Sequence, residues 1–213
     1  MLDSIHYISQ GSTIAEQLTS IRGALEGGCK LIQLRFKNVD EASFLEVGKQ
    51  AREWCTEFNA IFIVNDYVHL AKQLQADGVH LGLTDTRIEE ARAILGPDAI
   101  IGGTANTLED VLQRIDEKCD YVGLGPFRFT TTKEKLSPIL GIDGYRSILT
   151  ELTDRHVSIP VYAIGGITLG DVEELMKTGI YGIAVSGIIT TAPDKKEIVD
   201  ALHQKSGNYV TNR

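Results

Sequence analysis

Strand-like and helix-like segments alternate eight times along the 213 residues, and this repeat restricts the fold more than any other feature of the sequence. Short apolar, β-branched runs predict strands at 5–9, 31–35, 61–65, 78–81, 100–104, 121–125, 161–165 and 182–186. Amphipathic stretches predict helices at 14–27, 40–58, 68–74, 87–95, 107–118, 142–155, 169–177 and 194–204. Eight such units without a linker indicate a single α/β domain over 1–213, a (β/α)8 TIM barrel. The alternative, a doubly wound open sheet, usually has fewer strands, and its GxGxxG fingerprint is missing here.

Composition narrows the class of protein. A net charge of −8 argues against general binding to nucleic acid or to an anionic membrane. No apolar run approaches the roughly 20 residues that span a bilayer, and the first ten residues have no basic segment typical of a signal peptide. Cys29, Cys55 and Cys119 are isolated and lack metal-ligand spacing. We interpret them as reduced packing residues and expect a cytoplasmic protein.

The second predicted strand ends in QLRFK, in which Gln33, Arg35 and Lys37 alternate with apolar residues. A period of two directs these three side chains to the same side. Placing two cations inside a barrel is costly unless an anion is present, and this pair of cations suits a diphosphate. The alternative is that Arg35 and Lys37 lean into solvent at the strand end. Active sites of such barrels lie at the C-terminal ends of strands, which favours the binding role.

Two carboxylates follow neighbouring strands at the same predicted end of the barrel. Asp66 comes directly after the third strand and Asp85 shortly after the fourth. Carboxylate oxygens beside a phosphate site are normal ligands of Mg²⁺. Each aspartate also precedes a helical segment, so the alternative is that both serve as helix caps. His80, on the fourth strand, is interpreted as packing or hydrogen-bonding internally rather than as a base.

Glycine and hydroxyl residues mark a second anion site. Gly166 follows the seventh strand, and Ser186 and Gly187 follow the eighth, where barrel enzymes often bind a phosphate monoester. The alternative is that these residues only form tight turns. The long segment 126–140 carries Thr130, Thr132 and Lys133, which are able to reach between the two anion sites; such a long loop is often functional.

Several ordered motifs together resemble the thiamine phosphate synthase family. They are QLRFK at 33–37, ND at 65–66, ADGVHLG at 76–82 with Asp85, GLGPFRFTTTK at 123–133, AIGGI at 163–167, and Ser186-Gly187. The resemblance implies a (β/α)8 transferase that joins 4-amino-2-methyl-5-(diphosphooxymethyl)pyrimidine to hydroxyethyl-thiazole phosphate. The products would be thiamine monophosphate and diphosphate. The implied partners are these small molecules, not nucleic acid or membrane, and a homo-oligomer is left open.

The resemblance also assigns roles to individual residues. The pyrimidine diphosphate would be held by Gln33, Arg35, Lys37, Asn65, Thr104 and Lys133, of which Arg35, Lys37 and Lys133 would act in catalysis. Asp66 and Asp85 would bind Mg²⁺. The thiazole phosphate would be held by Thr130, Thr132, Gly166, Ser186 and Gly187.

The chain departs from the family pattern in three places. Leu83 replaces a common glutamine, the fifth strand has Thr104 and Asn106 in place of a GxSxH pattern, and Phe127-Arg128-Phe129 is unusually bulky and basic. Asn106 leaves any proton-transfer role at that position open.

Three rival functions remain. A thiazole tautomerase of the same superfamily would have no use for a diphosphate and metal cluster. Another phosphate-binding barrel isomerase or lyase would leave that cluster unexplained too. A catalytically silent barrel that binds thiamine phosphates is the third.

Overall fold

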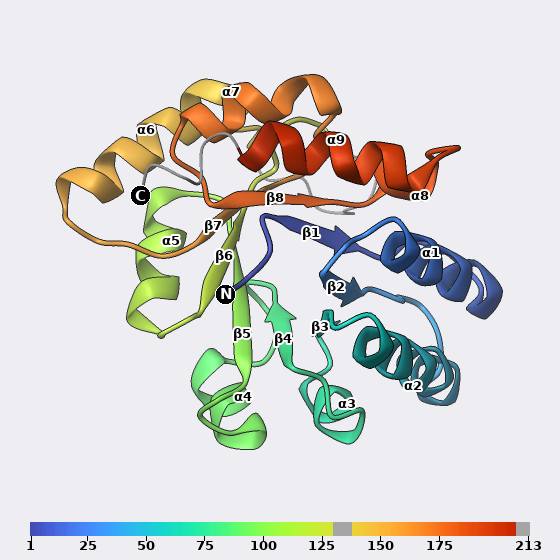
Figure 1. The fold of residues 1–213 in the computed structure, drawn as a ribbon. Helices are drawn as coiled ribbons and strands as arrows, with labels where there is room; N and C mark the ends of the chain where they lie inside the picture. The colour runs from blue at the N-terminus through green and yellow to red at the C-terminus, as the bar shows by residue number, and fades with distance from the viewer. Residues whose placement is uncertain (130–137, 208–213) are drawn as a thin grey trace.

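The predicted barrel is present in the structure, a computed structural model that describes residues 1–129 and 138–207. Eight parallel strands pair in chain order and close between the last and the first. They are β1 (Ile5–Ile8), β2 (Leu31–Leu34), β3 (Ile61–Asn65), β4 (Gly78–Leu81), β5 (Ile100–Ala105), β6 (Tyr121–Leu124), β7 (Val161–Ile164) and β8 (Gly182–Val185). The helices surround them (Figure 1): α1 (Ile14–Glu26), α2 (Glu41–Glu57), α3 (Val68–Gln73), α4 (Ile88–Leu95), α5 (Leu108–Asp116), α6 (Gly141–Asp154), α7 (Val172–Lys177), α8 (Gly187–Thr190) and α9 (Lys195–Gly207).

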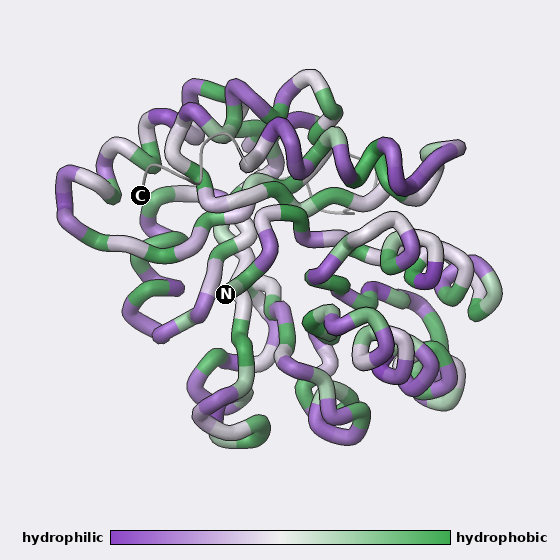
Figure 2. The backbone as a smooth tube through the Cα atoms, in the orientation of Figure 1, coloured by the Kyte–Doolittle hydropathy of each residue, from purple (hydrophilic) through white to green (hydrophobic). Residues whose placement is uncertain are grey.

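Most strand residues are apolar, as expected for a parallel sheet that is buried on both faces. The buried hydrophobic residues form two clusters. The larger cluster lies between the strands and the inner faces of the helices, and the smaller one fills the barrel. Hydrophilic and hydrophobic residues alternate along the surrounding helices, as expected for elements with one face in solvent (Figure 2). Among the described residues, no helix is long and apolar enough to cross a membrane.

Aromatic rings occupy the middle of the barrel. His6 lies edge-on to Tyr121 and Tyr162, at centroid distances of 5.5 and 5.6 Å. Gly102, opposite Tyr121 in the β5–β6 register, makes room for this ring, because a Cβ at Gly102 would lie 2.0 Å from Cζ of the tyrosine. Burial lowers the pKa of His6 to about 3, so this histidine is neutral at physiological pH.

The observed boundaries of most elements differ from the predicted ones by one to three residues. The strand predicted at 31–35 ends at Leu34, and the helix predicted at 169–177 begins as a 3-10 turn, η1 (Leu169–Asp171), before α7. Sequence reasoning missed α8, whose four residues are Gly, Ile, Ile and Thr. This composition has low helix propensity and is too short to show a helical period.

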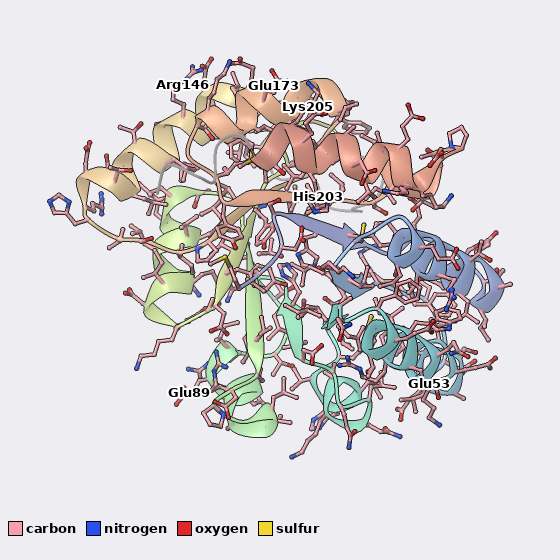
Figure 3. All side chains as sticks on the ribbon, viewed as in Figure 1. Glu53, Glu89, Arg146, Glu173, His203 and Lys205 are labelled. Atoms are coloured by element: carbon pink, nitrogen blue, oxygen red, sulfur yellow. The ribbon has the colours of Figure 1, made fainter. Side chains whose placement is uncertain are left out.

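An ion pair ties α9 to the segment just before β1. His203 lies on α9 (Figure 3), and its Nε2 is 2.9 Å from Oδ1 of Asp3. The hydrogen bond to Asp3 raises the pKa of His203, although burial lowers it. Asp200 makes a smaller contribution that also raises this pKa.

A pH-dependent stability follows from that shift. A raised pKa in the folded state means that the pair stabilises fully below the unfolded pKa of about 6.5 and is lost as pH rises through the folded value. We predict that His203→Gln, which keeps a neutral hydrogen bond, lowers the melting temperature at about pH 6 and has almost no effect near pH 9. Thermal melts at both pH values measure this; an equal loss at both would contradict it.

Candidate active site at the carboxyl ends of the strands

The first polar group lies where β2 and β3 end. Gln33 and Asn65 are both buried, and Gln33 Nε2 donates to Asn65 Oδ1 over 2.7 Å. Two side-chain amides in this position supply fixed donors and acceptors at the floor of the barrel mouth. The contact confirms that β2 and β3 direct these two predicted residues to one place.

Arg35 and Lys37 lie beyond the end of β2. The Arg35 backbone is held on both sides, since its N–H donates to Ser9 Oγ and its carbonyl accepts from Gln17 Nε2. Phe36 between the two cations is buried in the core, so the predicted alternation continues. Lys37, however, is exposed on the rim, with 45% of its side chain accessible, and not inside the barrel. The strand hydrogen bonds stop at Leu34, which lets the chain turn outward.

Lys37 pairs with the first of the two predicted metal ligands. Its Nζ lies 3.0 Å from Oδ2 of Asp66, whose side chain is only 20% accessible. Burial raises the pKa of Asp66, and the Asp85 carboxyl within hydrogen-bonding reach raises it further, whereas Lys37 opposes both. The structure thus brings together one cation and two carboxylates that repel each other.

Neither aspartate caps a helix, so that alternative is wrong for both. The N-cap residues of α3 and α4 are Tyr67 and Arg87, and neither has a side-chain capping bond. Asp66 has a left-handed backbone, with φ of 66°, and Asp85 Oδ2 instead accepts from the N–H of Gly82 over 2.6 Å. Both carboxylates keep oxygens for another role.

The two carboxylates fit a magnesium ion. In the described part of the chain, no group of three or more His, Cys, Asp or Glu side chains is placed so that it could hold a metal ion. Mg²⁺ is usually bound through one or two carboxylates, with the remaining positions taken by water and substrate phosphate. A divalent cation between Asp66 and Asp85 would also offset the repulsion that raises the pKa of Asp66.

A buried hydrogen-bonded chain lies under the mouth. His80 Nδ1 is 3.1 Å from the hydroxyl of Tyr121, and His80 Nε2 is 3.1 Å from Oγ1 of Thr104. These contacts confirm that His80 bonds internally, and they fix the Thr104 side chain. Asn106, the residue after β5, donates from Nδ2 to the carbonyl of Gly125. Tyr121 was missed because its hydroxyl meets His80 only when the folded sheet places β4 and β6 on either side of β5.

The second anion site gathers residues that follow β7 and β8. Gly165 and Gly166 have φ of 93° and 70°, a region that disfavours side chains. Ser186 Oγ donates to Gln10 Oε1 over 3.3 Å, and Gly187 is the first residue of α8. Sequence reasoning missed Gln10, which comes from the loop after β1. The predicted residues Thr130, Thr132 and Lys133 lie outside the described residues.

Comparisons with known proteins agree over nearly the whole chain. A family model described as "Thiamine monophosphate synthase" matches residues 5–189. The thiamine-phosphate synthase of Flavobacterium psychrophilum is 54% identical over 205 residues, covering 96% of this chain and all of the relative. The enzyme of the same name from Bacteroides fragilis is 50% identical over 194 residues, covering 91% and 95%. The solved thiamine phosphate pyrophosphorylase from Pyrococcus furiosus superposes with a TM-score of 0.84 at 34% identity, covering 97% and 96%.

Proposed function

The chain belongs to the thiamine monophosphate synthase family, and from this membership we propose how its own residues carry out the family's reaction. The enzyme is a transferase that joins the pyrimidine diphosphate to hydroxyethyl-thiazole phosphate, giving thiamine monophosphate and diphosphate. We propose Mg²⁺ as its cofactor, held by Asp66 and Asp85. The observation that carries this proposal is the convergence of those two carboxylates beside Lys37.

The diphosphate end of the first substrate belongs, in this proposal, beside Asp66. Bound there, Mg²⁺ would neutralise charge on the departing diphosphate. Arg35, Lys37 and Lys133 hold the remaining phosphate oxygens, with Lys37 turning from Asp66 toward the substrate. Charge developing on the leaving group is thereby met by cations already in place.

The pyrimidine ring lies over the floor made by Gln33, Asn65 and Thr104. These side chains are pre-ordered by the bonds from Gln33 to Asn65 and between Thr104 and His80. Fixed hydrogen-bonding groups orient the ring without a further loss of side-chain freedom on binding. In this position, the exocyclic methylene of the pyrimidine points toward the second anion site.

The bond changes need no protein nucleophile. The methylene C–O bond breaks, and its electron pair leaves with the diphosphate. The electron-rich aminopyrimidine stabilises the cation, and the lone pair of the thiazole nitrogen forms the new C–N bond. Thr130, Thr132, Gly166, Ser186 and Gly187 hold the thiazole phosphate, so that its nitrogen is aimed at the methylene. Catalysis is then mainly positioning and charge stabilisation.

We predict metal-dependent formation of thiamine monophosphate. Purified protein is incubated with both substrates and Mg²⁺, with and without EDTA, and the product is followed by chromatography. Turnover is expected to fall to background with EDTA and to return when excess Mg²⁺ is added. Product formation that EDTA leaves unchanged would contradict the cofactor proposal. Isomerisation of a thiazole substrate without joining would favour the tautomerase.

We also propose a cytoplasmic location. Cys29 and Cys55 are buried, and Cys119 is partly buried; all three are free thiols, as is usual in a reducing compartment. Cell fractionation with an antibody against the protein tests this; recovery outside the cytoplasmic fraction would contradict it.

A further inference from the structure

Arg128, from the unusual Phe127-Arg128-Phe129 segment, joins the loop after β6 to the turn after β7. Its Nη1 and Nη2 donate to the two carboxylate oxygens of Asp171, over 2.6 and 2.9 Å. Nη1 also donates to the carbonyl of Gly166 over 3.0 Å. The guanidinium carbon lies 4.7 Å from the centroid of the Phe127 ring. This one side chain, from the loop after β6, therefore contacts the turn after β7 and the last residue of η1.

Backbone bonds continue the same connection. The N–H groups of Phe127 and Arg128 donate to the carbonyls of Ile164 and Gly165, over 2.8 and 3.1 Å. The pairing of β6 with β7 thus extends past both strand ends and into the glycine turn. Thr130, one of the residues assigned to the thiazole phosphate, follows Arg128 by only two positions.

Gly166 lies directly against the Arg128 side chain. A Cβ at Gly166 would come within 2.5 Å of Arg128 Cγ and 3.0 Å of the Phe129 carbonyl. Only a glycine allows this approach together with a φ of 70°. Because Arg128 packs against Gly166 and binds its carbonyl, the position of the Arg128 side chain influences the conformation of the Gly165-Gly166 turn. The turn conformation in turn sets the direction of its backbone N–H groups.

An exposed ion pair is usually worth little, and 45% of the Arg128 side chain is accessible. This ion pair differs in three ways. The guanidinium binds both carboxylate oxygens of Asp171, its Nη1 also donates to the backbone carbonyl of Gly166, and it stacks on the ring of Phe127. Asp171 is itself fixed, since its Oδ2 accepts from the N–H and hydroxyl of Thr168. The hydrogen bonds from Arg128 and Thr168 lower the pKa of Asp171 to about 2, so it remains ionised at physiological pH.

We propose that Arg128 and Asp171 form a clasp that positions the Gly166 turn for the phosphate of the thiazole substrate. Neither residue contacts the reacting atoms; both are positioning residues. This inference rests on the proposed function, which assigns the thiazole phosphate to Gly166. Because the clasp positions only the thiazole phosphate site, its loss should weaken binding of the thiazole phosphate. Binding of the pyrimidine diphosphate should stay unchanged.

The test compares Arg128→Ala, Arg128→Lys and Asp171→Asn with the wild type. The lysine keeps the charge but loses the bidentate geometry, and the asparagine keeps an oxygen for Thr168 but loses the anion. Arg146→Ala is the matched control, because Arg146 points outward from α6 (Figure 3) and pairs with Asp143 in the same helix. Binding of thiazole phosphate is measured by calorimetry, and both KM values and kcat by steady-state kinetics.

All three clasp variants are expected to weaken thiazole phosphate binding roughly tenfold, the lower end of the value of a hydrogen bond to a charged group. The KM for the pyrimidine diphosphate and kcat should change less than about twofold, because those depend on the other half of the site. Arg146→Ala should match the wild type.

Three results would overturn the clasp. The first is unchanged binding in Arg128→Ala. The second is wild-type affinity in Asp171→Asn with weak binding in Arg128→Ala, which would mean that Arg128 contacts the phosphate itself. The third is a parallel rise of both KM values with early melting, which marks a merely structural role. Wild-type protein that binds thiazole phosphate but makes no product would instead overturn the proposed function alone. Wild type that binds none would overturn both.

Discussion

Asp66→Asn is expected to lower kcat/KM by about a thousandfold, since it removes a charge that the transition state needs for the metal. Asparagine is the suitable replacement because it is among the few residues that tolerate the left-handed backbone found there, with φ of 66°. It keeps the shape of the side chain and removes only the anionic ligand. The loss of activity should therefore come without a loss of fold.

The same substitution should not lower the melting temperature at neutral pH. Burial and Asp85 raise the pKa of Asp66 despite the opposing Lys37. A raised pKa in the folded state means that the stability due to this carboxyl is full below its unfolded pKa, about 3.9, and is lost as pH rises through the folded value. At neutral pH the ionised form is a cost to the apoprotein, and asparagine removes that cost.

Kinetics and thermal melts on one set of samples check both statements. Mg²⁺ should raise the melting temperature of the wild type, because a ligand that binds only the folded state stabilises it. The variant should show almost no such rise. Asp98→Asn, at an exposed position outside the site, serves as the control. Full metal-dependent turnover in Asp66→Asn would show that this carboxylate is not a ligand.

Lys37→Met is expected to lower kcat/KM for the pyrimidine diphosphate by about a hundredfold, with little effect on stability. The ion pair to Asp66 involves a partly exposed lysine, and such pairs contribute little to folding. The same ammonium next to a departing diphosphate acts on charge that develops only in the transition state. Methionine retains the apolar stem and removes the charge alone.

Lys30→Met offers a matched control at the opposite end of the same strand. Lys30 precedes β2, and its Nζ donates to the carbonyl of Phe58, far from the strand's carboxyl end. Lys30→Met should have wild-type kinetics. If both lysine variants lose activity equally, general charge and not position would explain the effect. If Lys37→Met retains full activity, its role in holding the diphosphate is refuted.

The sequence alone was enough to predict the barrel, because the signal for each unit is local. The bounds predicted for β3 and β4 are those observed, since each is a short apolar run bounded by polar or small residues. The prediction for β2 ran one residue too far, because Arg35 continues the alternation of side chains after strand pairing has ended. Periodicity describes where side chains point, whereas a strand end depends on hydrogen bonds to a neighbour.

The site was predicted only in part. Residues at the carboxyl ends of strands could be listed from the sequence, since parallel strands bring all those ends to one edge. Whether Asp66 and Asp85 cap helices or face each other could not be decided, because both roles fit the same local sequence. The structure excludes the caps and places the carboxylates together beside Lys37.

Contacts across long stretches of chain were decided only by the tertiary structure. His80 on β4 meets Thr104 on the neighbouring β5 and Tyr121 on β6, and Arg128 meets Asp171 over 43 positions of sequence. No local pattern encodes these partners, because each depends on the closure and register of the sheet. The sequence therefore determined the barrel and the edge at which its polar residues gather, through short-range periodicity. The pairing of those residues was set by the packing of distant segments against one another.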